Sequence, residues 1–315
     1  YAYQQNVEIK EVKPVRISHN MIAQNMIRAI QTNLESLTKS QEMMSSGKRV
    51  NRPSDDPPAT NNIISIHTAL SINRQYTRNI NDGLAWLNQT DAVLGDAIEL
   101  LHKARDFAVQ GASGTLTRED MQAIAREVDG IIDGMANVAN SNIGGTYIFA
   151  GMQNAAPPFD VDKSAETVTF SGNTDAVLRE IASDFTVQVD AGGVVFGATG
   201  PGSVTSGVFF TLFQLRDALD AGDNTAVSSL IGGIDQRIDE MMVHRVKIGS
   251  RTNQLESLKS QLQDQEVRLT GILSCLQDAD IARTSIEFGQ HKLAYEATLS
   301  AGARLLQTSL LDFLK

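Results

Sequence analysis

The sequence predicts a mainly α-helical protein, in which long antiparallel helical rods are built from both chain ends and carry a small β-rich central insert. Three observations predict this fold class. Apolar residues recur at alternating steps of three and four near both ends, and this helical period lapses in the middle. Only 11 Phe, 5 Tyr and 1 Trp stand among 315 residues, whereas compact enzyme cores usually contain more large rings.

The longest helix is predicted from an apolar seam, meaning positions at alternating steps of three and four, that starts at Ile63 and ends at Leu101. Nine of its twelve seam positions are Ile or Leu, and the exceptions are Asn73, Thr77 and Asp91. A continuous seam of this length predicts a rod of about 60 Å.

A second helix follows after a short turn. Gly111 and Gly114 end the long rod, and Thr117 with Asp120 forms a capping signature for the next helix. Two rods joined by a short turn should form an antiparallel hairpin. The second helix keeps the same seam spacing, at Met121, Ile124, Val128, Ile131, Met135 and Val138.

Both ends of the chain carry amphipathic stripes. The N-terminal stripe runs from Ala23 to Met44 with one polar exception, Gln41, and Gly47 ends it. The C-terminal stripes cover residues 255–276, with one break at Gln265, and residues 288–313. Because a single helix cannot bury its own apolar stripe, we expect the two ends to run antiparallel beside each other. The part of each stripe that stays uncovered would be an adhesive surface.

The middle of the chain is predicted to be rich in β-structure. Short β-prone runs occur at residues 167–170, 185–189 and 194–196, and six glycines with Pro201 punctuate the later part. Helical signals return at residues 212–219 and again from Ile231.

Composition excludes several classes of function. Acidic residues outnumber basic ones by 37 to 27, which argues against a nucleic-acid binder. No apolar run is long enough to span a membrane, and the first 14 residues have no apolar signal core. The single Cys275 excludes an intrachain disulfide, and we expect it to fill a small apolar gap.

Candidate chemistry is sparse. Asp55 and Asp56 form the one carboxylate pair that could suggest acid–base chemistry. Because prolines flank them, we expect them to cap a helix rather than act as general acid and base. The five histidines fall on separate segments without metal-ligand spacing. No residue is therefore predicted to be catalytic, to bind a cofactor or to hold a metal.

Three segments resemble signature motifs of bacterial flagellins. They are residues 45–57 (SSGKRVNRPSDDP), 79–84 (NINDGL) and 249–255 (GSRTNQL). Residues 145–151 (GTYIFAG) and the ending SLLDFL at 309–314 resemble the hook-associated junction branch of this family more than filament flagellin. Residues 1–15 depart from the family pattern, because Val15 stands where the initiator Met is expected.

The resemblance implies a flagellin-like coiled-coil shaft. Its terminal helices would form an inner tube, its rods the next layer, and its β insert the outer face. It divides the chain into an extension that is not part of the family, an N-terminal assembly helix, two parts of the rod around the insert, and a C-terminal assembly helix. The expected segments are 1–15, 16–52, 53–150, 151–210, 211–276 and 277–315, the fourth being the insert.

The resemblance also implies a function. The protein would be a structural subunit at the hook tip that joins hook to filament, and not an enzyme. It would be exported through the flagellar type III apparatus to an extracellular position. The alternative is flagellin, the filament subunit itself. A cytoplasmic coiled-coil scaffold or an enzyme on a helical stalk would need an independent site, and none is found.

The implied partners are neighbouring copies in a ring, the other hook-associated protein on the hook side, flagellin on the filament side and a cytoplasmic export chaperone. No cofactor, nucleic acid or membrane is expected. The predicted assembly interface consists of apolar residues on the terminal stripes: Ile27, Ile30, Leu34, Leu37, Met44, Tyr295, Leu299, Leu306, Leu310 and Phe313. The predicted chaperone-binding residues are apolar positions near the C-terminus: Leu293, Leu299, Leu306 and Leu310.

The stripes also predict coupled ordering and assembly. Isolated terminal segments would lose roughly 1–2 kcal/mol of backbone entropy per residue on ordering without burying enough apolar area to offset it. We therefore expect mobile termini in the monomer and ordered helices in the assembly.

Overall fold

The computed structural model describes residues 19–313, with side chains described for residues 21–304. The chain forms two compact units. Unit 1 contains the described residues up to Ala69 and from Arg268 onward, and unit 2 is Leu70–Val267. Unit 1 therefore combines two segments that are distant in the sequence, whereas unit 2 is one continuous segment.

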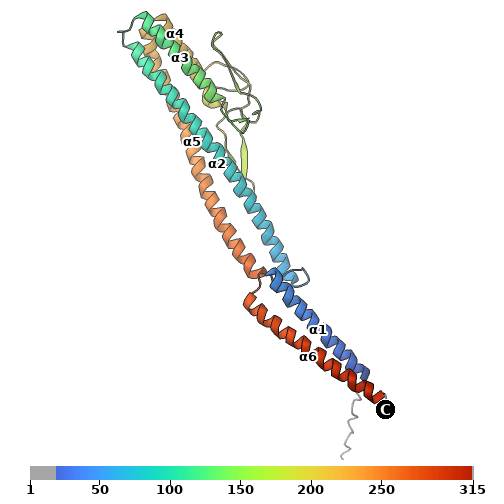
Figure 1. Ribbon diagram of the computed structural model, residues 1–315. Helices are drawn as coiled ribbons and strands as arrows, with labels where there is room; N and C mark the ends of the chain where they lie inside the picture. The colour runs from blue at the N-terminus through green and yellow to red at the C-terminus, as the bar shows by residue number, and fades with distance from the viewer. Residues whose placement is uncertain (1–18, 314–315) are drawn as a thin grey trace, which may run out of the picture. The chain divides into compact units, whose positions relative to one another are not determined.

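Six α-helices make up most of the structure, as predicted (Figure 1). Helix α2 begins before the predicted seam, because Pro57 suits the first turn of a helix and the Asp56 carboxylate accepts a hydrogen bond from the backbone N–H of Ala59 at 3.1 Å. It ends at Ala112, between Gly111 and Gly114, as predicted. The helices are α1 His19–Ser46, α2 Pro57–Ala112, α3 Arg118–Ala139, α4 Val208–Ala221, α5 Asn224–Gln277 and α6 Ile281–Phe313.

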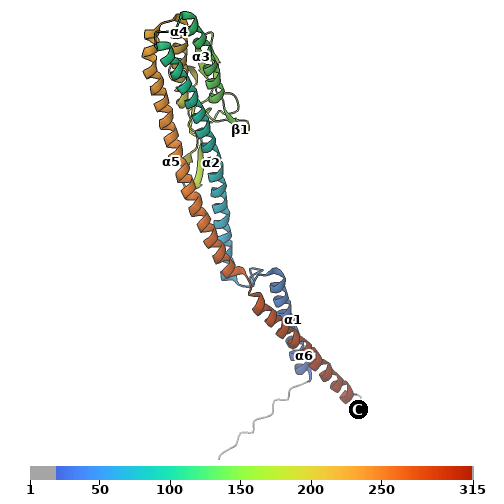
Figure 2. The same ribbon diagram turned by 60° about the vertical axis from the view of Figure 1, so that its left-hand side comes forward.

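In unit 2, α2 and α5 lie side by side and antiparallel, which Figures 1 and 2 both show. Asn73 Nδ2 donates to the Leu262 carbonyl at 3.1 Å. Asp91 accepts two hydrogen bonds of 2.8 Å from Arg245. Residue numbers of the bonded partners rise along α2 and fall along α5, so helices from the two halves of the chain pair in antiparallel orientation, as expected.

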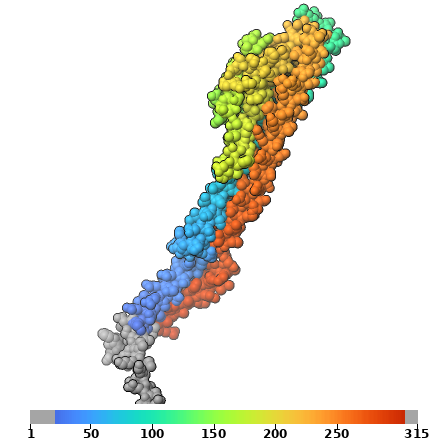
Figure 3. Space-filling view, turned by 180° about the vertical axis from the view of Figure 1, so that it is seen from behind, coloured from blue at the N-terminus to red at the C-terminus, as the bar shows by residue number. Residues whose placement is uncertain are grey.

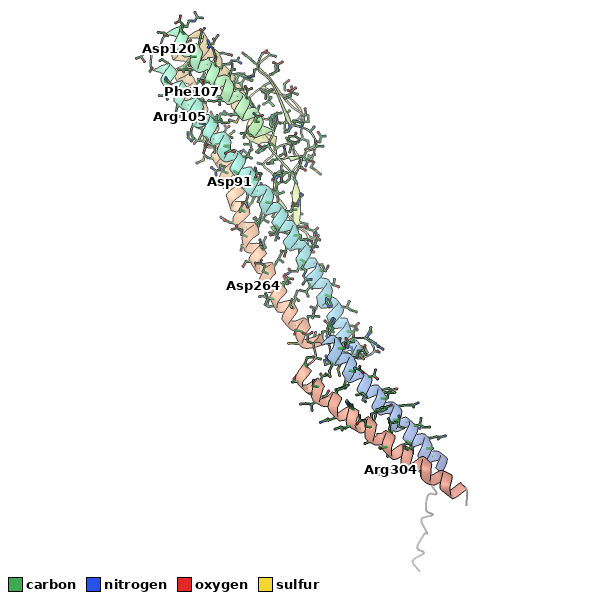
Figure 4. All side chains as sticks on the ribbon, viewed as in Figure 1. Asp91, Arg105, Phe107, Asp120, Asp264 and Arg304 are labelled. Atoms are coloured by element: carbon green, nitrogen blue, oxygen red, sulfur yellow. The ribbon has the colours of Figure 1, made fainter. Side chains whose placement is uncertain are left out.

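One polar break in each predicted seam faces the other. Asn73, buried to 3% exposure, lies on α2 with its Nδ2 atom 3.5 Å from Oε1 of Gln265, the break in the α5 seam. The third break, Asp91, is paired with Arg245, and the hydrogen bonds from Arg245 lower the pKa of the Asp91 carboxyl. Figure 4 labels Asp91 and Arg105 on α2. Because a polar group inside an apolar seam is satisfied in only one alignment, these pairs fix the register of α2 against α5.

Helix α3 folds back on α2 and packs against α4, which gives the predicted hairpin (Figure 1). The predicted capping box is confirmed, because Thr117 Oγ1 accepts from the Asp120 N–H at 3.2 Å and the Thr117 N–H donates to Asp120 at 3.1 Å. The Thr117 hydroxyl, which donates to Asp120 Oδ2 at 2.7 Å, and then the Thr117 N–H lower the pKa of the Asp120 carboxyl.

Residues 142–204 contain three small antiparallel sheets, and the first of them, β1–β2, lies before the predicted insert at 151–210. A three-stranded sheet has the order β3–β4–β7, and Phe159 pairs with Phe170 across β3 and β4. The Phe159 and Phe170 rings lie 5.0 Å apart, and Phe196 lies 5.5 Å from Phe159, so aromatic rings fill the core of the insert. The strands are β1 Asn142–Ile143, β2 Thr146–Tyr147, β3 Phe159–Asp162, β4 Thr167–Phe170, β5 Leu178–Ala182, β6 Phe185–Gln188 and β7 Gly202–Val204.

Two of the three β predictions are confirmed and one is wrong. Strand β4 covers residues 167–170, and β6 covers most of 185–189, with β5 as its partner. Residues 194–196 instead lie in a short 3₁₀ helix, Gly193–Phe196. Val195 and Phe196 are adjacent and both buried, whereas a strand would direct them to opposite faces.

In unit 1, α1 and α6 run antiparallel beside each other (Figures 1 and 2). Asn33 Nδ2 donates to Thr298 Oγ1 at 2.7 Å, and Gly302 is buried next to Met26 and Ile30. A small core of Val50, Ala59 and Ile63 packs against two partly buried leucines of α5, Leu273 and Leu276. Cys275 is exposed, so the expectation that it fills an apolar gap is wrong: it lies one position away from the residues that face this core. No helix in the described part of the chain is long and apolar enough to cross a membrane.

The close approach of α2 to α4 generates a testable prediction. A Cβ atom at Gly111 would lie 2.5 Å from Cδ2 of the buried Leu219, whereas nothing lies within 4 Å of a Cβ at Gly130 on α3. We expect Gly111→Ala to lower the free energy of unfolding of unit 2 by about 1–2 kcal/mol, since overpacking outweighs the gain in helix propensity. The matched Gly130→Ala variant should raise it by up to about 1 kcal/mol.

Urea unfolding followed by the fluorescence of Trp86, the only tryptophan, measures both changes because Trp86 is buried in unit 2. Equal effects of the two substitutions would show that α2 and α4 do not pack this closely.

Candidate assembly surface

The loop of residues 47–56, called the signature loop below, belongs to the first motif and connects α1 to α2. Gly47 takes φ +69°, which ends α1 at a conformation that other residues adopt only with strain, and its N–H donates to the Met43 carbonyl. Asp55 then accepts the backbone N–H groups of Asn51 at 3.1 Å and Arg52 at 2.9 Å. The loop therefore closes on itself around one carboxylate.

The signature loop also holds the turn between α5 and α6. The Arg49 N–H donates to the Gln277 carbonyl at 2.7 Å, and the Ala279 N–H donates to the Gly47 carbonyl at 2.9 Å. The Arg49 guanidinium donates to the Leu276 carbonyl at 2.8 Å, near the C-terminal end of α5. These bonds connect the segment before α6 to the end of α1, so the two terminal helices start from neighbouring points in unit 1.

Asp56 caps α2 as predicted, because it accepts the Ala59 N–H, whereas Asp55 accepts N–H groups of the loop and does not cap the helix. The Arg52 backbone N–H is the main cause that lowers the pKa of Asp55. The Ala59 N–H, followed by the Arg49 guanidinium 3.1 Å away, lowers the pKa of Asp56. Both carboxyl groups thus stay ionised at neutral pH, which suits capping and not proton transfer. Among the described residues no group of three or more His, Cys, Asp or Glu side chains could hold a metal ion.

The predicted assembly stripe on α1 is only half covered by α6. Ile30 and Leu37 are half-buried, and Ile30 lies close to Gly302 of α6. Ile27 keeps 56% and Leu34 45% of its surface exposed, although both belong to the same seam. Met44 is exposed as well. A single partner helix covers one edge of the stripe and leaves the other edge open.

Helix α6 shows the same division. Tyr295 is half-buried, whereas Leu293 is 68% and Leu299 41% exposed. The predicted residues Leu306, Leu310 and Phe313 lie in α6, but their side chains are outside the described part of the chain.

Sequence reasoning missed Ile286, which forms a second apolar row on α6 with Leu293, a residue predicted only for chaperone binding. Ile286 is 63% exposed and lies seven residues before Leu293, so both project from the same side of the helix. Thr284 and Gly302, which are buried, lie on the opposite side and face α1. The prediction followed one seam through Phe288 and Tyr295, whereas the spacing of Ala282, Ile286, Leu293 and Ala297 was the available signal for a second face.

Two family models match this chain. The bacterial flagellin N-terminal helical region matches residues 17–154, and the bacterial flagellin C-terminal helical region matches residues 231–314. Together they cover more than half of the chain, including the signature loop and both terminal helices. The protein therefore belongs to the bacterial flagellin family of structural flagellar proteins.

Individual relatives narrow this class. The chain is 27% identical to flagellar hook-associated protein 3 of Escherichia coli over 321 residues, which covers 96% of this chain and all of the relative. It is 25% identical to Bacillus subtilis flagellin over 296 residues, with 90% of this chain and 94% of the relative covered. The crystal structure of Bacillus cereus FlgL matches with a TM-score of 0.56 and 25% identity, covering 67% of this chain and 99% of that chain. These relatives favour the hook–filament junction branch over filament flagellin.

The bonds of the signature loop generate a prediction. We expect Arg49→Met to lose the hydrogen bond to the Leu276 carbonyl and the ion pair with Asp56, and so to weaken the loop by about 1 kcal/mol, because the side chain is half exposed. Amide hydrogen exchange at Arg49 and Ala279 should become roughly fivefold faster. Arg52→Met is the control, since Arg52 makes only an exposed pair with Glu42 through its side chain. Similar exchange in both variants would contradict the role given to Arg49.

Proposed function

We propose that this protein is a structural subunit of the bacterial flagellum that assembles at the hook tip and links hook to filament. The observation that carries the proposal is the uncovered half of the terminal stripes, on Ile27, Leu34 and Leu293, in a family of structural flagellar proteins. The protein acts outside the cell, as a part of the flagellum reached by export. Its role is mechanical, and we assign it no catalysis.

The stripes supply the energy of assembly. Each large apolar side chain that passes from water into a contact between copies contributes roughly 1.5–3 kcal/mol. Part of this gain offsets the entropy lost when side chains and helices become ordered. Several such residues per copy, repeated around a closed set of neighbours, are enough for stable association only when the neighbours are already in place. Assembly therefore occurs at the hook tip and not in free solution.

The contacts divide among four partners. Ile27, Ile30, Leu34, Leu37 and Met44 of α1 meet neighbouring copies together with the apolar residues of α6, which are Tyr295, Leu299, Leu306, Leu310 and Phe313. The other hook-associated protein lies on the hook side, and flagellin lies on the filament side. Before export a cytoplasmic chaperone covers the C-terminal helix through Leu293, Leu299, Leu306 and Leu310, because these side chains would otherwise aggregate.

The second candidate function is that of flagellin, the filament subunit. The similarity to Bacillus subtilis flagellin over most of the chain favours it, because the same stripes could build a filament. The two functions differ in one behaviour: flagellin polymerises alone into long fibres, whereas a junction subunit adds only to hooks that already carry its partner.

Deletion of the gene in a flagellated host tests the proposal. Hooks without filaments, with flagellin lost to the medium, are the expected result. Short or absent hooks, or fibres that grow from the purified protein alone, would contradict it.

The exposed half of the α1 stripe gives a specific prediction. We expect the double variant Ile27→Asp, Leu34→Asp to fold like the wild type, since both side chains are exposed in a single copy. It should fail to restore filaments in the deletion host, because burying two carboxylates in a copy–copy contact costs several kcal/mol. Gln24→Asp, Gln31→Asp is the matched control, as it adds the same charge at exposed polar positions of α1. Swimming and electron microscopy of the hooks provide the readout. Normal filaments in the double variant would exclude this stripe from assembly.

Limited proteolysis tests the state of the terminal helices before assembly. We expect a protease to trim both ends of the soluble protein and to spare a core of residues 63–254, because α1 and α6 bury few apolar side chains against each other. Mass spectrometry of the stable fragment locates the cuts. Ends as resistant as the core would show that the terminal helices are stable without neighbours.

A further inference from the structure

Unit 2 has an uncovered apolar surface on α5 that unit 2 itself does not use. Met242, Val243 and Val246, called the α5 patch below, are 48%, 53% and 71% exposed. Together with Asp239 and Lys247 they line a shallow hollow of about 500 Å³. Neither Asp239 nor Lys247 forms an ion pair with any residue of the described chain.

The α5 patch faces away from the rest of unit 2. Ile238, Met241 and Ile248 are buried on the side of α5 that packs inward, and they alternate with the exposed residues along the helix. Figure 3 shows α5, in orange, forming one side of unit 2, while the insert, in yellow-green, lies on the other side. No element of unit 2 is therefore placed to cover the hollow.

A second exposed apolar group lies where the β5–β6 hairpin meets α2. Ile72 is 47% and Phe185 45% exposed, and Tyr76 lies one turn after Ile72 on the same side of α2. We call these three residues the hairpin patch. The Tyr76 hydroxyl donates to Glu180 Oε1 at 3.5 Å, which places this carboxylate beside the ring. Burial raises the pKa of the Tyr76 hydroxyl, and the charges of Glu180 and Asp184 raise it further. Asp184 accepts a hydrogen bond from Ser183 at 3.4 Å and has no cationic partner among the described residues.

The hairpin is held firmly in place. Asn79 Nδ2 donates to the Glu180 carbonyl at 2.7 Å, and Arg179 forms an ion pair with Asp82 at 2.7 Å. From α5, Arg251 donates to the Asp190 carbonyl at 3.1 Å, just after β6. A rigid projection loses little conformational entropy on contact, so the hairpin patch is suited to insert into another surface.

We propose that the hairpin patch of one copy inserts into the α5 patch of a neighbouring copy, with Asp184 placed against Lys247. Both surfaces present exposed apolar side chains. The α5 patch carries Lys247 at one end and Asp239 at the other, so Asp184 of the hairpin patch is attracted to the Lys247 end and repelled from the Asp239 end, which sets the orientation of the contact. Because they lie on different elements of one chain, the contact is heterologous and repeats from copy to copy. This inference rests on the proposed function, since it names the surface through which assembled copies meet in unit 2.

The positions of the patches predict the geometry of the contact. The Asp91–Arg245 pair places the α5 patch level with Asp91 on α2, whereas the hairpin patch lies level with residues 72–76. At 1.5 Å per residue this offset is about 25 Å along the helices. Two parallel copies joined in this way are displaced by that amount, so the contact connects copies at different heights in the assembly.

Charge exchange tests the pairing. We expect Lys247→Glu alone and Asp184→Lys alone each to reduce the amount of protein retained on isolated hook tips roughly tenfold, because each places like charges together. The double variant should recover to within about twofold of the wild type. Lys103→Glu on α2 and Asp220→Lys on α4 are matched controls at exposed positions outside both patches, and they should bind as the wild type does. Trp86 fluorescence melts verify that every variant folds.

Crosslinking provides a second measurement that does not depend on charge. In a Cys275→Ser background, one chain carries Phe185→Cys and a co-expressed chain carries Val246→Cys. Oxidation of isolated hooks should yield a disulfide-linked dimer only when both chains are present. If the wild type binds hook tips while both charge variants bind equally well and no crosslink forms, this interface is wrong and the junction function stands. Failure of the wild type itself to bind hook tips would instead contradict the proposed function.

Discussion

The antiparallel pairing of helices from opposite ends of the chain is the contact on which the rest of the structure depends. In unit 2 it joins α2 to α5, and in unit 1 it joins α1 to α6. A helix with one apolar stripe needs cover along its length, because its stability comes mainly from packing. In unit 2 the insert and two further helices complete this cover around residues such as Leu87, Leu94 and Leu101, which are fully buried. In unit 1 the two terminal helices have only each other. The need to cover an apolar stripe is therefore met within unit 2, whereas in unit 1 part of each stripe stays exposed.

Polar residues decide how the helices align. An apolar seam alone would tolerate a shift by one heptad, because one Leu packs much like the next. Asn73 meets Gln265, and Asp91 meets Arg245, in only one alignment. Residues of two family motifs fix the position of the β5–β6 hairpin. Asn79 and Asp82 bind it to α2, and Arg251 binds the segment after β6 to α5. The third motif ties the α1–α2 loop to the α5–α6 turn through Arg49. The motifs that place this chain in the flagellin family are therefore connections between elements distant in sequence.

Function follows from where cover is missing. Ile27, Leu34 and Leu293 are apolar and exposed on helices that already have one neighbour, and in the function proposed above a second neighbour comes from another molecule. In such a subunit, part of the apolar surface is buried on folding and part only on assembly. The contact between α1 and α6 buries the first part, and burial of the second part would favour assembly.

By itself the sequence determined the helices, the position of the insert, the pairing of the chain ends, the caps at Asp56 and Thr117, and the family, because each depends on local spacing or a contiguous motif. Several features needed the tertiary structure. The 3₁₀ helix at Gly193–Phe196 forms because Val195 and Phe196 must both enter the same core, which local β propensity does not register. Ile286 was missed, and Leu293 was predicted only for chaperone binding, because only the position of α1 separates a covered face of α6 from an open one. Seam periodicity shows that a side chain is apolar, but its neighbours in space decide whether it is buried, and those neighbours come from remote parts of the chain.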